Sequence, residues 1–471
     1  MGAKHTMFVR LYQQYKICFE ISLKKIIPIL IILLSNLAVA QENPRFSLLA
    51  KRKTVSESNG SIGINPQFSY KMIEPNQDLR KVNILLDERE EGVIKDKSLT
   101  VGTSLILISD YQRSNTDSKF AYLMRHPTSA NQIGTEVSEA VVHSFHLAFT
   151  GAVTNWLTAF AEILYNPEQS FGEGTITSLG RNQLQLRKGF VVFGDLRKFP
   201  IYFSIGKMDA PFGQIGSVNP FTNSTMWHAF GGLGYGAQLG FKKWGIQANI
   251  MAVQGGAQFR AMHTPVGDST NVPSEINNFT ADLNYTLRIG NGFKFLFGGS
   301  YLHGSAYCQD FPVFHFEACG KNNPAVSIYA NLKIKDRFTL MGGYAETLEV
   351  WPGTHNPNPP LDVYEASKVT SLDIGIKYDI NLRGKIKYAL SGEFSDLHSG
   401  PFGAPWERQN QIVVGFSGMI WNSSKLFIEL FRTDGYVPLN FISGGNLDPG
   451  ETHCVRDAFS HGVVLGCQIT L

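Results

Sequence analysis

The sequence predicts an all-β fold: a transmembrane, antiparallel, up-and-down β-barrel of about 16 strands, preceded by a short periplasmic N-terminal segment. Three observations predict it. Segments of about ten residues alternate apolar and polar side chains, the connections between them are alternately short and long, and beyond residue 40 no apolar run is long enough for a spanning helix. Hydrophobic residues make up 43% of the 471 residues and charged residues 17%, which excludes a disordered chain.

Residues 1–40 are predicted to be a secretory signal peptide. Lys24 and Lys25 precede the apolar run Ile26–Leu37, and Ala38-Val39-Ala40 forms a small-x-small cleavage site. A retained membrane anchor is the alternative. The run disfavours it because its 12 residues fall short of the roughly 20 that a spanning helix needs.

The charge of the chain after this cut is nearly balanced. Residues 1–40 hold five bases and one acid, so 37 of the 42 bases and 38 of the 39 acids remain. Nucleic-acid binding needs a basic surface, and this balance provides none. We therefore expect no nucleic-acid partner.

Residues 41–97 are polar and of mixed charge, with no sustained apolar period. The run Asp87-Glu88-Arg89-Glu90-Glu91 is typical of a solvated surface. We expect residues 41–97 to form a periplasmic N-terminal segment without a core of its own, and residues 98–471 to form the barrel.

The clearest strand is Phe279–Ile289, in which every odd-numbered residue is apolar and every even-numbered residue is polar or charged. Strands of a soluble sandwich would alternate in the same way, so the alternation alone does not place the sheet in a membrane. The predicted strands are 99–110, 141–151, 156–166, 182–194, 201–209, 234–243, 245–254, 278–289, 293–302, 324–335, 338–347, 368–380, 385–395, 410–420, 425–436 and 460–471.

The connections between these strands favour the membrane barrel. Every second connection is a short polar turn, such as Lys243-Trp244 or Asp336-Arg337, and the others span roughly 14 to 30 residues rich in Gly, Pro, Asn and Ser. This pattern is typical of a barrel with periplasmic turns and external loops. The alternating end, Val463 to Leu471, resembles the C-terminal sorting signal of bacterial outer-membrane barrels. We therefore expect the chain in the bacterial outer membrane, in contact with its lipid.

A barrel of this size is expected to enclose a water-filled lumen lined by the polar faces of its strands. The predicted pore-lining residues are Arg187, Lys207, Asp282, Arg288, Lys333, Asp373, Lys377, Lys387 and Glu393. They carry both signs of charge, which can orient a small polar solute, and the alternative is that they only keep the lumen wet. Lys207 shares its parity with apolar Ile201, Phe203 and Ile205, so a bulge or an interfacial position is the alternative there.

The connection after the fifth strand predicts a loop that narrows the lumen. Its prolines stiffen the chain, and its glycine allows it to fold back inward. The predicted constriction residues are Pro211, Phe212, Gly213, Asn219 and Pro220. An ordinary surface loop is the alternative.

Phe203-Ser204-Ile205-Gly206-Lys207 followed by Pro211-Phe212-Gly213 resembles the corresponding region of the LbtU-type siderophore porins. The family has a signal peptide, a short periplasmic segment and a barrel of sixteen strands, and it is implicated in ferric-siderophore uptake without a plug domain. The resemblance implies that function here. Phosphate- and sugar-selective porins share the Pro-Phe-Gly feature, so the alternatives are a general, sugar- or phosphate-selective porin, or a structural or adhesive surface barrel.

No catalytic residue, metal site or cofactor is predicted, and the chain is not expected to be an enzyme. His143-Ser144-Phe145-His146 places a hydroxyl close to two imidazoles, but the sequence shows no third group to orient them. The oligomeric state, monomer or trimer, stays open.

Four cysteines remain after the cut, and their spacing matches no zinc motif. Cys308 and Cys319 lie in one long connection with ten residues between them, and we expect them to form a disulfide in an oxidising compartment. The alternatives are two free thiols, or Cys454 as a rival partner.

Overall fold

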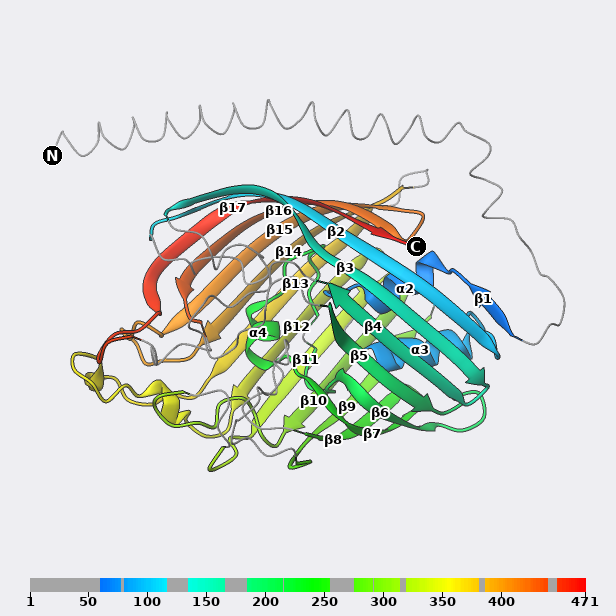
Figure 1. Cartoon of the computed structure of the whole chain (residues 1–471), viewed down its shortest axis with the longest axis horizontal. Coiled ribbons are helices and arrows are strands. Elements are labelled where there is room, and N and C mark those ends of the chain that lie inside the picture. The colour runs from blue at the N-terminus through cyan, green and yellow to red at the C-terminus, as the bar shows by residue number, and fades with distance from the viewer. Residues whose placement is uncertain are drawn as a thin grey trace, which may run out of the picture. The chain divides into compact units, whose positions relative to one another are not determined.

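The computed structural model describes residues 60–77, 80–116, 134–165, 184–214, 216–254, 275–290, 292–313, 319–380, 386–438 and 447–471. Strands β2 to β17 form a closed barrel of sixteen strands (Figure 1). Each strand pairs antiparallel with the next, and β17 pairs antiparallel with β2 to complete the ring. The predicted all-β fold, a closed antiparallel barrel of about 16 strands, is confirmed. The predicted signal peptide lies outside the described residues.

All sixteen predicted strands are present. The strands are β2 Ser98–Ser114, β3 Glu136–Thr154, β4 Leu157–Tyr165, β5 Leu184–Phe193, β6 Ile201–Asp209, β7 Leu233–Lys243, β8 Ile246–Val253, β9 Asn278–Ile289, β10 Phe293–Leu302, β11 Ala325–Ile334, β12 Phe338–Thr347, β13 Thr370–Ile380, β14 Ile386–His398, β15 Arg408–Ile420, β16 Ser424–Tyr436 and β17 Val455–Thr470. β3 and β17 begin earlier than predicted, because their first residues mix apolar and polar side chains without strict alternation.

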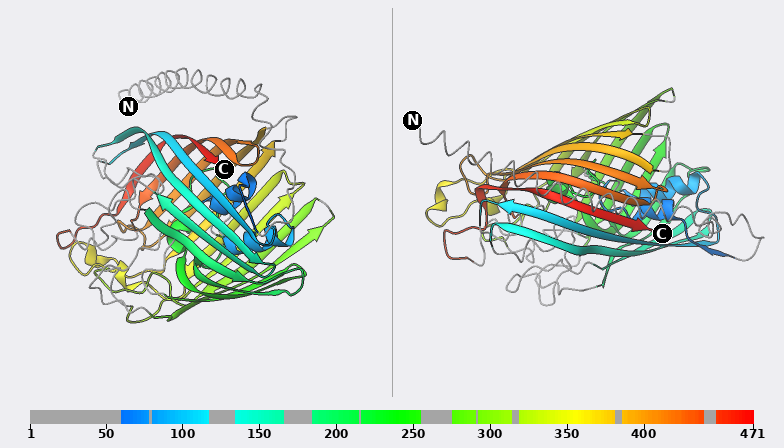
Figure 2. Two further views of the ribbon diagram at one scale, coloured as in Figure 1. Left: turned by 45° about the vertical axis from the view of Figure 1, so that its right-hand side comes forward. Right: turned by 90° about the horizontal axis from the view of Figure 1, so that it is seen from above.

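The short connections lie at one end of the barrel, the turn end, and the long ones at the other, the loop end (Figures 1 and 2). Two turns have consecutive residues with positive φ: Lys335 and Asp336, both at 51°, and Trp421 and Asn422, at 52° and 59°. Two consecutive residues with positive φ are typical of type I′ turns, whose twist matches that of the strands they join.

The two faces of each strand have opposite character. On β9, Phe279, Leu283 and Tyr285 are 37%, 60% and 37% exposed, whereas the alternate residues Asp282 and Asn284 are each 3% exposed. The apolar side chains therefore point outward and the polar side chains point into the barrel.

Residues 60–97, here called the lumen segment, enter the barrel from the turn end (Figure 2). They form β1 Ser61–Gly63, α2 Pro66–Ile73 and α3 Lys81–Glu90. Asn65 caps α2 by accepting a hydrogen bond from the Phe68 amide (3.1 Å), and Pro66 occupies the first turn. No helix in the described part of the chain is long and apolar enough to cross a membrane.

The lumen segment shares a hydrophobic core with the barrel. α2 contributes Met72 and Ile73 and α3 contributes Leu85 and Leu86, all buried. The inner wall contributes Ala148, Ala152, Phe160, Phe190 and Val192 to the same cluster. Burial of this apolar surface favours docking of the segment.

Loop 3, residues 210–232 between β6 and β7, also lies inside the barrel and contains the short helix α4 Thr225–Phe230. β1 pairs parallel with Ser98, Leu99 and Thr100 of β2. The pairing of β2 with β17 starts only at Ser104, so β1 covers the part of β2 that β17 leaves free.

Candidate functional site

Beside the apolar core, the interior of the barrel contains a polar network that joins the wall to the lumen segment and to loop 3. The carboxylate of Asp282 on β9 is its first centre. One oxygen accepts hydrogen bonds from the hydroxyls of Ser300 (2.7 Å) and Tyr329 (2.6 Å), and Asn284 donates to the other (3.0 Å). The wall alone thus supplies three hydrogen bonds that hold the Asp282 carboxylate in position.

Arg80 of the lumen segment completes this centre. Its guanidinium donates to both oxygens of Asp282 at 2.9 and 3.1 Å and to the carbonyl of Gly213 in loop 3 at 2.7 Å. Burial disfavours the charged form, but Asp282 and Tyr329 outweigh it and raise the pKa of Arg80 above its ordinary value. Arg80 therefore links the segment, the wall and loop 3 through charge-assisted hydrogen bonds.

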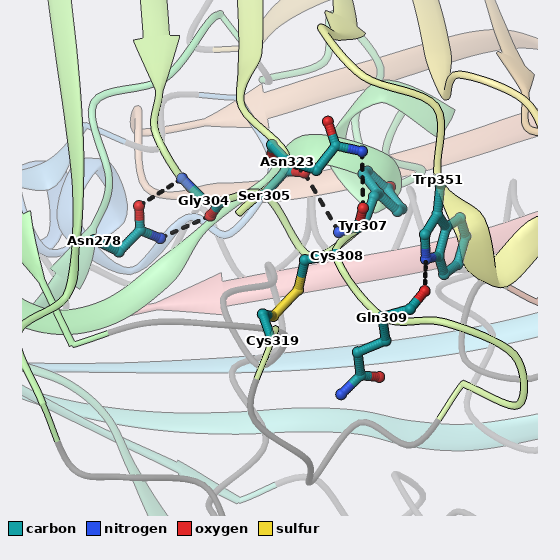
Figure 3. Close-up of a disulfide and its surroundings, with 9 residues drawn as sticks. All are labelled: Asn278, Gly304, Ser305, Tyr307, Cys308, Gln309, Cys319, Asn323 and Trp351. Carbon is teal, nitrogen blue, oxygen red and sulfur yellow. Dashed lines mark hydrogen bonds between the residues drawn. A yellow bond between two sulfur atoms is a disulfide. The ribbon is translucent and has the colours of Figure 1, made fainter. Parts of the chain in front are cut away.

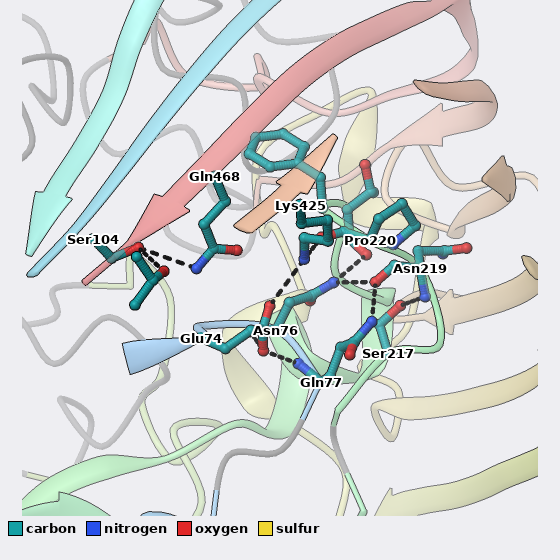
Figure 4. A network of polar contacts seen from close by, with 12 residues as sticks. Glu74, Asn76, Gln77, Ser104, Ser217, Asn219, Pro220, Lys425 and Gln468 are labelled. Carbon is teal, nitrogen blue, oxygen red and sulfur yellow. Dashed lines mark hydrogen bonds and ion pairs between the residues drawn. The ribbon is translucent and has the colours of Figure 1, made fainter. Parts of the chain in front are cut away.

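Lys425 on β16 forms the second centre (Figure 4). Its buried ammonium donates to the carbonyl of Pro220 (2.5 Å) and lies 3.6 Å from the carboxylate of Glu74. The side-chain amide of Asn76 donates to the carbonyl of Asn219 at 2.9 Å. The lumen segment and loop 3 are thus bound to each other as well as to the wall.

Glu74 is charged at this centre although it is buried. Burial alone would raise its pKa, but the nearby charges of Lys425 and Lys81 and the amides of Gln77 and Asn76 together lower it below the ordinary value. Its contribution to docking is therefore present near neutral pH and is lost as the pH falls through the lowered pKa.

Two further carboxylates hold loop 3. Glu393 on β14 accepts hydrogen bonds from the Ser217 hydroxyl (2.8 Å) and from the Val218 amide (2.9 Å). Glu429 on β16 accepts from the amides of Phe221 (2.7 Å) and Thr222 (3.1 Å). The wall thus supplies acceptors for backbone donors that a buried loop would otherwise leave unpaired.

The structure separates the predicted pore-lining residues into groups. Asp282 and Glu393 are buried under the lumen segment and loop 3, and Asp373 is buried without a hydrogen-bond partner in the described part of the chain. Lys377 forms an ion pair with Asp379 at 3.2 Å. Three of the predicted pore-lining residues point into the barrel near the turn end and are exposed there: Arg288, Lys333 and Lys387.

Arg187 and Lys207 lie on β5 and β6, near the loop end. Arg187 is the extra residue of a bulge on β5, and its charge acts on the inward-facing Glu162. Lys207 follows the outward register: its ammonium donates to the carbonyl of Leu186 (3.0 Å) and lies 5.6 Å from the ring centre of Tyr235, which is 45% exposed on the outer face. Lys207 therefore lies on the outer register of β6 and does not face the lumen.

The predicted constriction residues all lie in the inward-folded part of loop 3. These are Pro211, Phe212, Gly213, Asn219 and Pro220, and all are buried. Gly213 has a φ of 61°, a conformation that favours glycine and turns the chain beside Arg80.

The sequence did not point to four residues that hold the interior together: Glu74, Arg80, Lys425 and Glu429. On the inner face of β16, Lys425 and Glu429 alternate with buried Phe427 and Phe431. Because half of these inner residues are apolar, the hydrophobicity of the sequence does not clearly distinguish the inner face from the apolar outer face. A charged pair at i and i+4 inside an otherwise apolar strand was the available signal.

The structure adds the third group that the His143–His146 segment lacks in sequence. Ser144 Oγ lies 3.1 Å from His146 Nε2, and His146 Nδ1 lies 2.8 Å from Glu162 Oε1 on β4. A bulge turns His143 inward, where it meets Phe221 of loop 3 edge-on. Ser144 is only 1% exposed, so this arrangement is a buried polar network on the wall.

Cys308 and Cys319 form a disulfide with a Cα–Cα distance of 5.5 Å (Figure 3). It lies in the β10–β11 connection, where the Asn323 amide donates to the Tyr307 carbonyl (2.8 Å) and the Trp351 indole donates to the Gln309 carbonyl (3.1 Å). Cys454 is unbonded and buried. The disulfide therefore braces a loop that already contacts the next one.

We expect mass spectrometry of unreduced peptides to show the link between Cys308 and Cys319. Replacing both by serine should lower the stability by about 3 kcal/mol, because the unfolded loop gains conformational freedom. The measurement is the temperature at which the folded band is lost in unheated gels. Cys467→Ala is the matched control and should leave that temperature unchanged, and free thiols at both positions would contradict the prediction.

Exposed apolar side chains surround the barrel on its outer face. Members that are about half exposed are Leu239, Ile250, Ile374, Ile412 and Leu430. A closed barrel satisfies its backbone internally, and a band of this kind is stable when lipid covers it. The fold and this surface define the class: a transmembrane β-barrel.

Solved structures that align with this chain include the anion-selective porin from Comamonas acidovorans, with 12% identity, a TM-score of 0.45, and coverage of 79% of this chain and 99% of that one. Pseudomonas putida OprB aligns with 8% identity, a TM-score of 0.49, and coverage of 84% and 99%. The outer-membrane channel DcaP of Acinetobacter baumannii aligns with 12% identity, a TM-score of 0.45, and coverage of 79% and 97%. No protein-family model and no curated protein matches the sequence.

Proposed function

We propose that the chain is a porin-type channel of the bacterial outer membrane that conducts a polar solute, and that the lumen segment and loop 3 close it in this state. One observation carries the proposal: the barrel combines a lipid-compatible outer band with a charged inner wall whose carboxylates are occupied by side chains and amides of the chain itself. A barrel of sixteen strands is wide enough for an aqueous channel, whereas one of eight strands is filled by its own side chains.

The plug formed by these two elements distinguishes this barrel from an open pore. The segment and loop 3 are joined to the wall by a shared apolar core and by ion pairs and hydrogen bonds. Water can replace the polar contacts when the elements separate. Opening therefore requires movement of the segment, of loop 3 or of both, while the strands stay paired.

A ferric siderophore is our first candidate for the solute, on the resemblance of the region from Phe203 to Gly213 to the siderophore porins. A general, sugar- or phosphate-selective porin is the second candidate. Exposed cations on the inner wall near the turn end favour a negatively charged solute in either case.

Conductance of the purified full chain in planar bilayers tests the proposal. We expect small or rare currents for the closed state and well-defined steps in moderate urea, which weakens the docked elements before the barrel. Ferric siderophores, sugars and phosphate are then added in turn, and the solute that interrupts the current identifies the substrate class. Absence of current under every condition would indicate a structural or adhesive barrel.

A further inference from the structure

Three consecutive strands carry a cation at the same level of the inner wall. Lys294 on β10 pairs directly with Arg288 on β9 and with Lys333 on β11. Arg288 has the inward register of Asp282 and Asn284, its neighbours along β9, and all three cations are exposed near the turn end. We call Arg288, Lys294 and Lys333 the basic row.

The basic row has no ion-pair partner in the part of the chain that the structure describes, where other inward-facing cations such as Lys425 and Lys188 are paired. The charges that act on Lys294 are the cations Lys333, Arg288 and Lys242 and the carboxylate of Asp87. Like charges directly opposite each other across strands are unfavourable. A bound anion would remove that cost.

We propose that the basic row is a binding site for a doubly charged oxyanion, such as inorganic phosphate or a phosphate-like group of a larger solute. Neighbouring strands lie about 5 Å apart, so three long cationic side chains from adjacent strands can converge on one group. The guanidinium of Arg288 can contact two oxygens of an oxyanion at once, and the ammonium groups add point charges. This inference rests on the proposed function and extends it, because it names the class of solute that the channel would bind at its turn end.

Asp87 of α3 is the internal competitor for this site. Its carboxylate forms an ion pair with Lys242 on β7 and acts on Lys294. An anion that binds the basic row therefore weakens the hold of the wall on α3. Binding of an anion to the basic row therefore favours release of the lumen segment, and release of the segment favours binding of the anion.

Titration calorimetry with inorganic phosphate on the detergent-solubilised full chain tests the site. Lys294→Gln should weaken phosphate binding about fivefold, the effect of one nearby charge in water. Asp87→Asn should tighten it, because the competing carboxylate is removed. Lys243→Gln is the matched control: it removes the same charge from the next residue after Lys242, on the exposed outer register over the Trp244 ring, and should leave phosphate binding unchanged.

The outcomes separate the two proposals. Equal phosphate affinity of the unchanged chain and of Lys294→Gln, or equal loss in Lys243→Gln, overturns the anion site even if the bilayer shows channel currents. Selective loss in Lys294→Gln with no current under any condition supports the site and overturns the channel. When both hold, the reversal potential in asymmetric salt should also shift toward cations in Lys294→Gln.

Discussion

Arg80→Glu is expected to open the barrel. The substitution replaces a guanidinium that donates to both oxygens of Asp282 by a second carboxylate in a site where the Asp282 side chain is fully buried. Breaking a buried pair in this way costs about 3 to 5 kcal/mol, a shift of more than a hundredfold in the docking equilibrium of the lumen segment. Single-channel recordings should show a higher open probability, with the strand content unchanged in circular dichroism.

Two variants make this experiment specific. The charge swap Arg80→Glu with Asp282→Arg restores an attractive pair and should restore much of the closed state. Arg432→Glu is the matched control, because Arg432 forms an exposed ion pair with Asp434 on the outer register of β16. Opening in the control, or closed channels in Arg80→Glu, would show that the ion pair does not hold the plug.

Glu429→Ala is expected to release loop 3. It removes the acceptor for the amides of Phe221 and Thr222 and leaves buried donors unpaired, at about 1 to 3 kcal/mol for each. Lys425 also loses a nearby negative charge. Labelling of a cysteine placed at Val218, which is 4% exposed, should become at least tenfold faster, and the single-channel conductance should rise.

Glu346→Ala is the control for the loss of a carboxylate. Glu346 lies on β12 with an outward register and accepts an exposed hydrogen bond from the Tyr344 hydroxyl. Its removal should change neither the labelling rate at position 218 nor the conductance. If Glu429→Ala labels as slowly as the unchanged chain, the other contacts of loop 3, such as those of Glu393, are sufficient to hold it.

The wall of the barrel could be predicted from the sequence because each strand carries its own signal. Phe279–Ile289 alternates over its whole length, and the structure has β9 at Asn278–Ile289. The contents of the barrel carry no local signal, since Arg80 and Asp282 are 202 residues apart and Phe221 and Glu429 are 208 apart. Such residues become neighbours only when the strands close into a ring, so no local stretch of the sequence predicts their contact.

Lys207 shows the limit of a register argument near a strand end. Its charge suggested the lumen, whereas its parity with the apolar residues of β6 pointed outward, and the structure follows the parity. Arg187 shows a second limit of the register argument. The bulge that sets its direction depends on the pairing of β5 with β4, so the sequence of β5 alone does not predict it.

The anchors of loop 3 also impose an order on assembly. Loop 3 leaves the wall after β6, yet it is bound by β14 and β16, and Glu74, which precedes every strand of the ring, meets Lys425 of β16. Neither element can complete its contacts until the last strands have joined, and contacts so distant in the chain form slowly. We therefore expect a newly inserted barrel to pass through an unsealed stage, in which vesicles leak small ions until the lumen segment and loop 3 have filled the interior.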